Sequence, residues 1–435
     1  EPKTVDGKCS SCGECCSDIL LMSQKEIRRI REYIQRKHIK KPNGSKPGFV
    51  FAFVSGAVAT VTGIMVSQYM GKKDDEKVKS SISLNLFVVL LIALFSLFLS
   101  FCASKKLALM FSEDLLVCDQ AGKYMKTVAF TFPLSGSATI LAVVIRCKNH
   151  SEYPLYVSFA SALVNTALNY LLIFGHFAFP SLGIQGAAIA SLASQFVNLL
   201  FMILFFARLS SFSFKIILTR ADLQQYLAML LPIVFNEFLW TLGQNINTGI
   251  YGHLGTDELA AMSLTGPVQG LLMGALSGLS QAAGILIGKG LGEKEYDRSY
   301  AESKKLCLYG LVLSFLLSFL CILFASFYTN LYNVQKEVKV LGTYLLYAFA
   351  LLAPVKVLNM ILGGGIVRSG GKTKYIMVID MMGTWLIGLP LGLLSAFVFK
   401  LSLVWVYFIL SQEELFRLLV TIFIFKKKKW MNTLS

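Results

Sequence analysis

Residues 85–104 read NLFVVLLIALFSLFLSFCAS and hold no charged side chain. A helix of this length rises about 30 Å at roughly 1.5 Å per residue, which matches the hydrocarbon core of a bilayer. Further apolar runs of this kind occupy residues 156–174, 309–328 and 381–399. Lipid offers backbone groups no hydrogen-bond partners, so each run is expected to form a helix that crosses the membrane.

The composition of the whole chain points to the same class. Of its 435 residues 55% are apolar and only 15% are charged, and the mean hydropathy is +0.62. The apolar runs between residues 49 and 425 predict about eleven membrane-spanning segments. We therefore expect an all-α integral membrane protein, a class in which transporters and channels are commoner than enzymes.

The formal net charge of +16 would suit a nucleic-acid partner if it formed one patch. Instead, Lys and Arg concentrate in alternate short loops, such as 71–81 and 288–306, and in the run 426–429. The positive-inside rule explains this distribution and predicts a multi-pass protein of the cell membrane with a cytoplasmic C-terminus and no nucleic-acid partner. Eleven crossings would leave the N-terminus outside, although residues 25–46 are strongly basic.

An internal repeat divides the chain. Gly63, Ile64 and Gly71 recur 221 residues later as Gly284, Ile285 and Gly292. Repeated halves are common in transporters. We predict two pseudo-repeated bundles, an incomplete N-lobe of five helices over 48–221 and a C-lobe of six over 222–435 with its basic tail.

Four short motifs carry a resemblance to a known family. They are QYMGKKD at 68–74, LPIVFNE at 231–237, GIYGHLG at 249–255 and RSGGK at 368–372. The chain resembles the multidrug and toxin extrusion (MATE) transporters, and within them the MepA-like drug exporters. The family's first helix, which carries an acidic residue linked to cation coupling in part of the family, has no counterpart in this sequence.

The resemblance implies a secondary active transporter that exports cationic or amphipathic drugs by antiport with H⁺ or Na⁺ and confers drug resistance. It implies a monomer that works in the lipid bilayer and requires no cofactor. The sequence does not choose between the two coupling ions.

Glu237 is the first candidate for a transport residue because ionisable groups within a span are costly and tend to be functional. It lies near the middle of the apolar segment 223–251, and the family has an acidic residue in this helix. A carboxylate there could bind a proton, Na⁺ or a cationic drug in turn, and Trp240 could stack on a flat cation. One face of this helix is expected to carry a polar stripe, which Asn236 and Trp240 flank. The stripe consists of Glu237, Thr241, Gln244 or Asn245, and Thr248.

A second candidate set lies in the last third of the chain. Lys356 and Asn359 share one helix face, and Asp380 follows in the next apolar segment. A lone buried lysine is expensive, so we expect a salt bridge from Lys356 to Glu237 or Asp380. The alternative for Asp380 is a charge at a helix end that contacts headgroups or a loop.

Other polar positions have simpler explanations. Arg146 and Arg368 are expected to extend to the headgroups at the ends of their helices. Gly363–Gly365 is expected to allow bending or close helix packing. Ser158, Ser161, Asn165 and Asn169 form a polar face that we interpret as interhelical hydrogen bonding.

The first 47 residues form a separate segment with four cysteines in eight positions. Cys9, Cys12, Cys15 and Cys16 could bind zinc or an iron–sulfur cluster. The run resembles the opening of the YkgJ-like zinc- or iron-chelating family, whose later cysteines have no counterpart here. We therefore interpret residues 1–47 as a cysteine-motif fragment.

Two further functions stay open beside drug export. One is a lipid-linked saccharide flippase of the same superfamily, and the other is a membrane-anchored metal or redox protein that uses Cys9–Cys16. ATP-driven pumping is not expected, since the sequence contains no phosphate-binding GxxxxGK[ST] loop. An enzyme is not expected either, and no arrangement of Ser, His and Asp typical of a hydrolase is evident.

Overall fold

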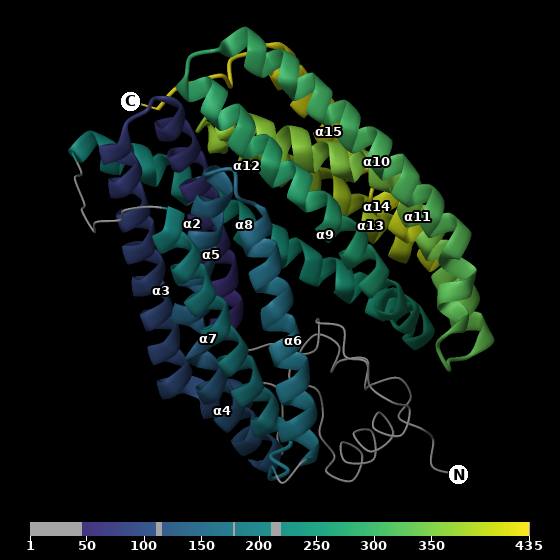
Figure 1. Ribbon diagram of the computed structural model, residues 1–435. Coiled ribbons are helices and arrows are strands. Elements are labelled where there is room, and N and C mark those ends of the chain that lie inside the picture. Colours follow the sequence, from purple (N-terminus) through teal and green to yellow (C-terminus); the bar gives the residue numbers. More distant parts are fainter. Residues whose placement is uncertain (1–45, 110–114, 177–178, 210–218, 435) are drawn as a thin grey trace. The chain divides into compact units, whose positions relative to one another are not determined.

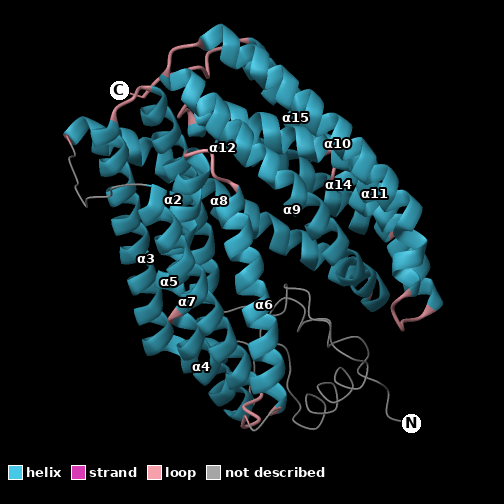
Figure 2. Cartoon of the chain, viewed as in Figure 1, coloured by secondary structure: helices cyan, strands magenta, loops and turns pink. Residues whose placement is uncertain are grey.

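The computed structural model describes residues 46–109, 115–176, 179–209 and 219–434, and this part of the chain consists of helices joined by short turns, without a strand (Figures 1 and 2). The predicted all-α fold is confirmed. The helices, with three π-helical stretches labelled η, are α2 (Lys46–Gly71), α3 (Asp75–Leu109), α4 (Leu115–Ala129), α5 (Thr131–Cys147), α6 (Glu152–Phe174), α7 (Ile184–Leu209), α8 (Arg220–Leu254), α9 (Thr256–Gly292), α10 (Tyr296–Asn330), α11 (Lys336–Asn359), η2 (Met360–Val367), α12 (Thr373–Met381), η3 (Met382–Gly388), α13 (Leu389–Leu393), η4 (Leu394–Val398), α14 (Leu403–Leu410) and α15 (Glu413–Lys426).

Ten helical segments of the described chain are long and apolar enough to cross a membrane, with α4 and α5 counted as one. Their outer faces are apolar: on α10, Phe315, Phe319 and Phe327 are all exposed. Such a surface is stable in lipid and not in water. α14 and α15 form a further apolar segment, interrupted at Ser411 and Gln412.

Local sequence explains where several helices begin and end. α8 begins after Thr219, whose hydroxyl accepts a hydrogen bond from the Asp222 amide at 3.1 Å while the Asp222 carboxylate accepts one from the Thr219 amide at 3.0 Å. This reciprocal pair is a capping box. α6 ends at Gly175, which takes a left-handed conformation with φ of 75°.

The described chain divides into two compact units. The first holds residues 46–62 and 79–209, and in it α7 packs against α4, α5 and α6. Its small core includes Phe51, Ala93 and Phe132. The second unit holds residues 63–78 and 219–434, so α2 begins in one unit and ends in the other.

The second unit has its core around α9 and α11. α9 packs against α10, α11 and η2, and α11 packs against α14 and α15. The glycines of η2 let it approach α9 closely: a Cβ on Gly365 would collide with the carbonyl group of Ser280. The expectation of close packing is thus confirmed at Gly365, whereas a Cβ on Gly363 or Gly364 would make only ordinary contacts.

α2 and α9 meet in a reciprocal contact inside the second unit. Gly71 lies against the carbonyl of Lys289, and Gly292 lies against the carbonyl of Gln68. The 221-residue repeat relates Gly71 to Gly292 and also Gln68 to Lys289. The two contacts are therefore equivalent under the repeat, as expected for pseudo-symmetric halves.

The segment 427–434, which follows α15, packs against the residues of this contact. Trp430 is completely buried, and its indole N–H donates to the Phe425 carbonyl at 3.2 Å. Gln68 is also completely buried: its amide donates to the Ser369 carbonyl at 2.6 Å, and its Oε1 accepts from the Leu434 amide at 2.7 Å. The end of the chain thus joins α2 to the turn that precedes α12.

Candidate functional site

The start of α15 places charged side chains inside the second unit. The break at Ser411 and Gln412 puts Glu413 and Glu414 in the first turn of α15, where carboxylates are favoured by the helix dipole. Arg417 lies one turn further on. Glu413 and Arg417 are buried, with exposed fractions of 4% and 8%.

Glycines of η3 make room for these side chains. A Cβ on Gly383 would lie 2.6 Å from Nε of Arg417, and a Cβ on Gly388 would collide with Oε2 of Glu413. The π-helical geometry of η3 brings both glycines opposite α15. Larger residues at either position would exclude the charged groups.

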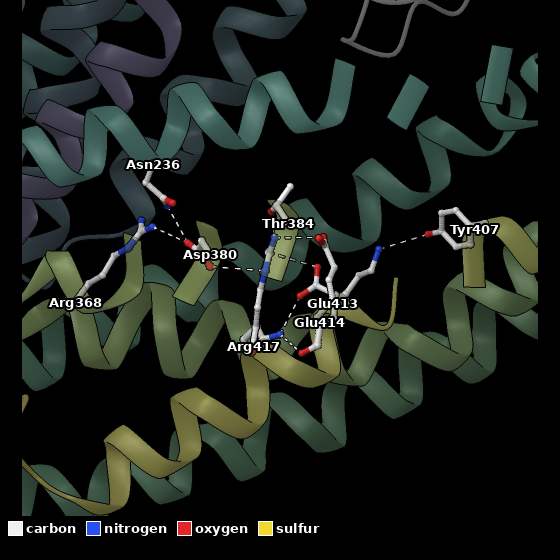
Figure 3. A network of polar contacts seen from close by, with 10 residues as sticks. Asn236, Arg368, Asp380, Thr384, Tyr407, Glu413, Glu414 and Arg417 are labelled. Carbon is white, nitrogen blue, oxygen red and sulfur yellow. Dashed lines mark hydrogen bonds and ion pairs between the residues drawn. The ribbon is translucent and has the colours of Figure 1, made fainter. Parts of the chain in front are cut away.

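Arg417 is the centre of the resulting ion-pair group (Figure 3). Its guanidinium lies 3.2 Å from Oε1 of Glu413, 3.9 Å from Oε1 of Glu414 and 3.9 Å from Oδ1 of Asp380. It also donates a hydrogen bond to the Thr384 hydroxyl. One cation therefore serves three carboxylates.

Arg368 extends this group toward α8. Its guanidinium lies 3.7 Å from Oδ2 of Asp380 and 3.9 Å from Oε1 of Glu237. Asn236, one residue before Glu237, donates to the same Asp380 oxygen at 2.8 Å (Figure 3). Asp380 thus links the residues of α15 to those of α8.

Residues of α11 lie at the other end of this group of polar contacts. Asn359 donates to Oε2 of Glu414 at 2.8 Å and to the Glu414 carbonyl at 2.7 Å. Lys356 donates to the Tyr407 hydroxyl at 3.4 Å, and this hydroxyl donates to Oε1 of Gln269 at 3.3 Å. The Lys356 ammonium also lies 5.4 Å from the centre of the Tyr407 ring.

We call the seven ionisable groups Glu237, Lys356, Arg368, Asp380, Glu413, Glu414 and Arg417 the charged network. Four of them are carboxyl groups and three are cations, so the fully ionised network carries one net negative charge. Uncompensated charge within apolar surroundings is costly. The network would become neutral on taking up one proton or one other monovalent cation.

The structure brings several predicted site residues together. Asn236, Glu237, Asn359 and Asp380 all contact members of the charged network. The predicted salt bridge from Lys356 to Glu237 or Asp380 is wrong, because Arg368 pairs with both carboxylates and Lys356 contacts Tyr407.

Arg368 also corrects the expectation that it extends to the headgroups. Only 14% of its side chain is exposed, and its guanidinium points to carboxylates of the neighbouring helices. The two carboxylates compensate part of the cost of removing this guanidinium from water. Arg146 is half-buried, and its Nε has no hydrogen-bond partner.

The rest of the predicted stripe on α8, together with the flanking Trp240, lies beside the network. Trp240, Gln244 and Asn245 are exposed. The Thr241 hydroxyl donates to the Glu237 carbonyl at 2.7 Å, and the Asn245 amide donates to the Thr241 carbonyl at 2.8 Å. These residues contact their own helix, and their part in transport stays a prediction.

The sequence interpretation missed Glu413, Glu414, Arg417 and Tyr407. A signal was available: Glu-Glu-x-x-Arg stands inside the otherwise apolar segment 403–425. Ionisable residues at this depth are functional candidates by the criterion that selected Glu237.

A polar pocket of about 250 Å³ lies between α6 and α7 of the first unit. Ser161 donates to the Ser194 carbonyl at 2.8 Å, Asn165 donates to the Ser194 hydroxyl at 3.3 Å, and Asn169 donates to Oδ1 of Asn165 at 2.7 Å. The predicted interhelical hydrogen bonding on this face is confirmed. The pocket is lined by Ser158, Ser161, Ala162, Asn165, Ser191, Ser194, Gln195 and Asn198.

The proposed metal ligands Cys9, Cys12, Cys15 and Cys16 lie outside the described residues. Within the described ranges, no group of three or more His, Cys, Asp or Glu side chains is arranged to hold a metal ion. Zinc or iron–sulfur binding thus stays a prediction about the cysteine segment.

Comparison with known proteins identifies the family. The sequence model of the MatE family matches residues 47–171 and 232–394, which together make up more than half of the chain. The chain belongs to the MATE family. The match in two stretches agrees with the internal repeat, and membership confirms the prediction of a membrane transporter rather than an enzyme.

Curated relatives are distant in sequence. The chain is 24% identical over 365 residues to the uncharacterized transporter YisQ of Bacillus subtilis, an alignment that covers 82% of this chain and 79% of that protein. It is 28% identical over 291 residues to the probable multidrug resistance protein NorM of Bacillus cereus, covering 63% of this chain and 62% of NorM. The second alignment thus spans less than two thirds of the relative.

Solved structures share the fold. The Vibrio cholerae MATE transporter VcmN in its bent form superposes with a TM-score of 0.79 at 16% identity, covering 96% of this chain and 92% of VcmN. The MATE transporter ClbM in complex with Rb⁺ gives a TM-score of 0.75 at 17% identity, covering 88% and 86%. At such identities the likeness supports the fold alone.

Proposed function

We propose that this MATE-family chain exports cationic or amphipathic small molecules in exchange for a coupling cation, with the charged network as the coupling site. The observation that carries the proposal is the surplus of one carboxyl group over the cations of the network. With this surplus, the network needs one exchangeable positive charge to become neutral. Relatives named as multidrug resistance proteins support the substrate class.

Glu237 is the carboxylate best placed to receive the substrate. One third of its side chain is exposed, the largest exposure among the ion-paired carboxylates of the network. The exposed Trp240 lies one turn away on α8 and offers an aromatic face to a flat cation. The pair with Arg368 is loose at 3.9 Å, so an incoming cation competes with Arg368 for Glu237.

Exchange follows from this competition. When a substrate cation neutralises Glu237, Arg368 is left to pair with Asp380, which also contacts Arg417. Charge at the exposed end of the network thus alters the balance at its buried end. A substrate and a coupling cation can therefore displace each other without occupying the same atoms.

The test is efflux of ethidium from cells that express the chain. Glu237→Gln should lower the efflux rate by about tenfold or more, which corresponds to roughly 1.4 kcal/mol in the barrier. Glu337→Gln is the matched control, because Glu337 is exposed at the start of α11. Equal efflux by the parent and Glu237→Gln, at equal membrane abundance, would remove Glu237 from the mechanism.

A flippase for lipid-linked saccharides is less well supported. A pyrophosphate group requires cations that are free to bind it. Arg368 and Arg417 each pair with carboxylates, and Lys356 contacts Tyr407. The network instead offers a carboxylate at its exposed end, which suits a cationic substrate.

A further inference from the structure

We infer that Glu413 is the carboxyl group that carries the coupling ion, as a proton, while Glu237 receives the substrate. This assignment rests on the proposed exchange function and deepens it. It names the coupling ion and separates the two binding sites. The four carboxylates of the charged network differ in the hydrogen-bond donors available to them.

Glu413 is the most buried of the four carboxylates and has few hydrogen-bond donors. Its side chain is 6% exposed, and within the described part of the chain its one ion pair is with Arg417, made through Oε1. Oε2 is buried without a hydrogen-bond partner and faces Gly388. The carboxylate therefore has one satisfied and one unsatisfied oxygen.

The other three carboxylates of the network have more donors near them or are partly exposed to solvent. Asp380 accepts a hydrogen bond from Asn236 and lies near both arginines. Glu414 accepts from Asn359 and also lies near Arg417. Glu237 is partly exposed. If one carboxyl of the four must carry a proton, Glu413 loses least by doing so.

The groups that face Glu413 come from four elements. Arg417 and Glu414 lie on α15, Asp380 on α12, Lys356 on α11 and Tyr251 on α8. Two of these are cations and two are carboxylates, so they balance each other. The charge of Glu413 is then the unbalanced one.

Proton uptake changes the network in a defined way. A hydronium ion of the aqueous phase gives its proton to Oε2 and leaves as water, the carboxylate becomes a neutral acid, and the net charge of the network goes from −1 to 0. Arg417 is then shared between Glu414 and Asp380 only. The change reaches Glu237 through Asp380 and Arg368, which releases Arg368 to compete with the substrate.

The experiment measures proton release when ethidium binds to the purified full-length chain in weakly buffered detergent solution. The parent should release about one proton per ethidium bound, as linkage requires if the two cations exclude each other. Glu413→Gln, which keeps the network neutral as protonation does, should bind ethidium more weakly than the parent and should release no proton on binding. Glu413→Asp, which keeps a titratable group, should restore the release, and Glu337→Gln should behave as the parent.

The same variants in proteoliposomes give the transport readout. The parent should respond to an imposed pH gradient, and Glu413→Gln should move ethidium at one rate with or without the gradient. Glu414→Gln should be slower than the parent yet keep the ratio of the two rates. Undiminished proton release by Glu413→Gln, or an equal loss in Glu414→Gln, overturns the assignment.

Two outcomes separate this inference from the proposed function. Transport driven by a Na⁺ gradient and indifferent to pH would overturn the role of Glu413 and leave exchange intact. No ethidium binding or transport by the parent would overturn the proposed function itself. If Glu413→Gln is not monodisperse, the Glu413→Asp variant decides: it should release protons with a shifted pH midpoint, and an unchanged midpoint overturns the assignment.

Discussion

Arg417 holds the charged network together because it is the only cation within ion-pair distance of both α15 carboxylates among the described residues. It is nearly buried, and its removal would leave Glu413, Glu414 and Asp380 with less compensation. Buried charges that lose their partner are strongly destabilising. The network thus has a structural role beside the proposed role in coupling.

Arg417→Met should destabilise the protein by about 3–5 kcal/mol, the usual cost of breaking a buried ion pair. Thermal unfolding of the detergent-solubilised protein measures the change. Arg298→Met is the matched control, since Arg298 is 66% exposed and pairs with Glu295 and Glu302 at the surface. Such surface pairs contribute about 0–1 kcal/mol. Similar unfolding temperatures for both variants would contradict the central place of Arg417.

At the scale of elements, the π-helical stretch η3 and the break before α15 create the site together. η3 supplies the space, through Gly383 and Gly388, and α15 supplies the charges. Interrupted helices at the ion or substrate site are typical of secondary transporters. The regular helices around them serve as the frame.

Gly388→Ala tests the fit of these two elements. The added methyl group would collide with Oε2 of Glu413, and overpacking of this kind costs about 1–3 kcal/mol. We expect a lower unfolding temperature and loss of efflux. Gly266→Ala on α9 is the control, because a Cβ there meets nothing within 4 Å and alanine favours the helix. Full efflux by Gly388→Ala would mean that the close contact is unimportant.

The packing of the segment 427–434 leads to a further prediction. Trp430 is completely buried, packs on Phe425 and donates to its carbonyl. Trp430→Ala should therefore cost about 3–5 kcal/mol, as large-to-small substitutions of buried aromatic residues do. Trp405→Ala should cost much less, since Trp405 is 59% exposed. Unfolding temperatures of the two variants in one detergent decide, and equal shifts would contradict the anchoring role.

Hydropathy predicts the membrane-spanning helices well but only some of the residues of the site. Long apolar runs such as 309–328 lie within helices because lipid allows no other backbone structure. The pairing of Glu237 with Arg368 could not be predicted, since it depends on how two helices 131 residues apart are rotated about their axes. The interruption before Glu413 was not predicted, although the polar residues 411–414 mark it within the otherwise apolar segment 403–425.

For the molecule as a whole, the repeat and the loop charges together predict how the chain is oriented in the membrane. The reciprocal contact of Gly71 with Lys289 and of Gly292 with Gln68 places corresponding ends of α2 and α9 together. Both ends adjoin basic loops, 71–81 and 288–306. The positive-inside rule then assigns both to the cytoplasm.

The same rule gives opposite sides to the two ends of α14–α15. Lys400 precedes α14 and is an isolated charge, whereas Lys426–Lys429 form a basic run at the end of α15. The run should stay in the cytoplasm, because translocating several lysines across the membrane is unfavourable. Lys400 and Lys428 are both exposed, so single cysteines introduced there can report the side of the membrane on which each lies.

In a chain whose nine native cysteines are replaced by alanine, Lys400→Cys should react with an impermeant maleimide in intact cells. Lys428→Cys should react only after permeabilisation. The reverse pattern would place the C-terminus outside and invert the access of protons and substrate to the charged network.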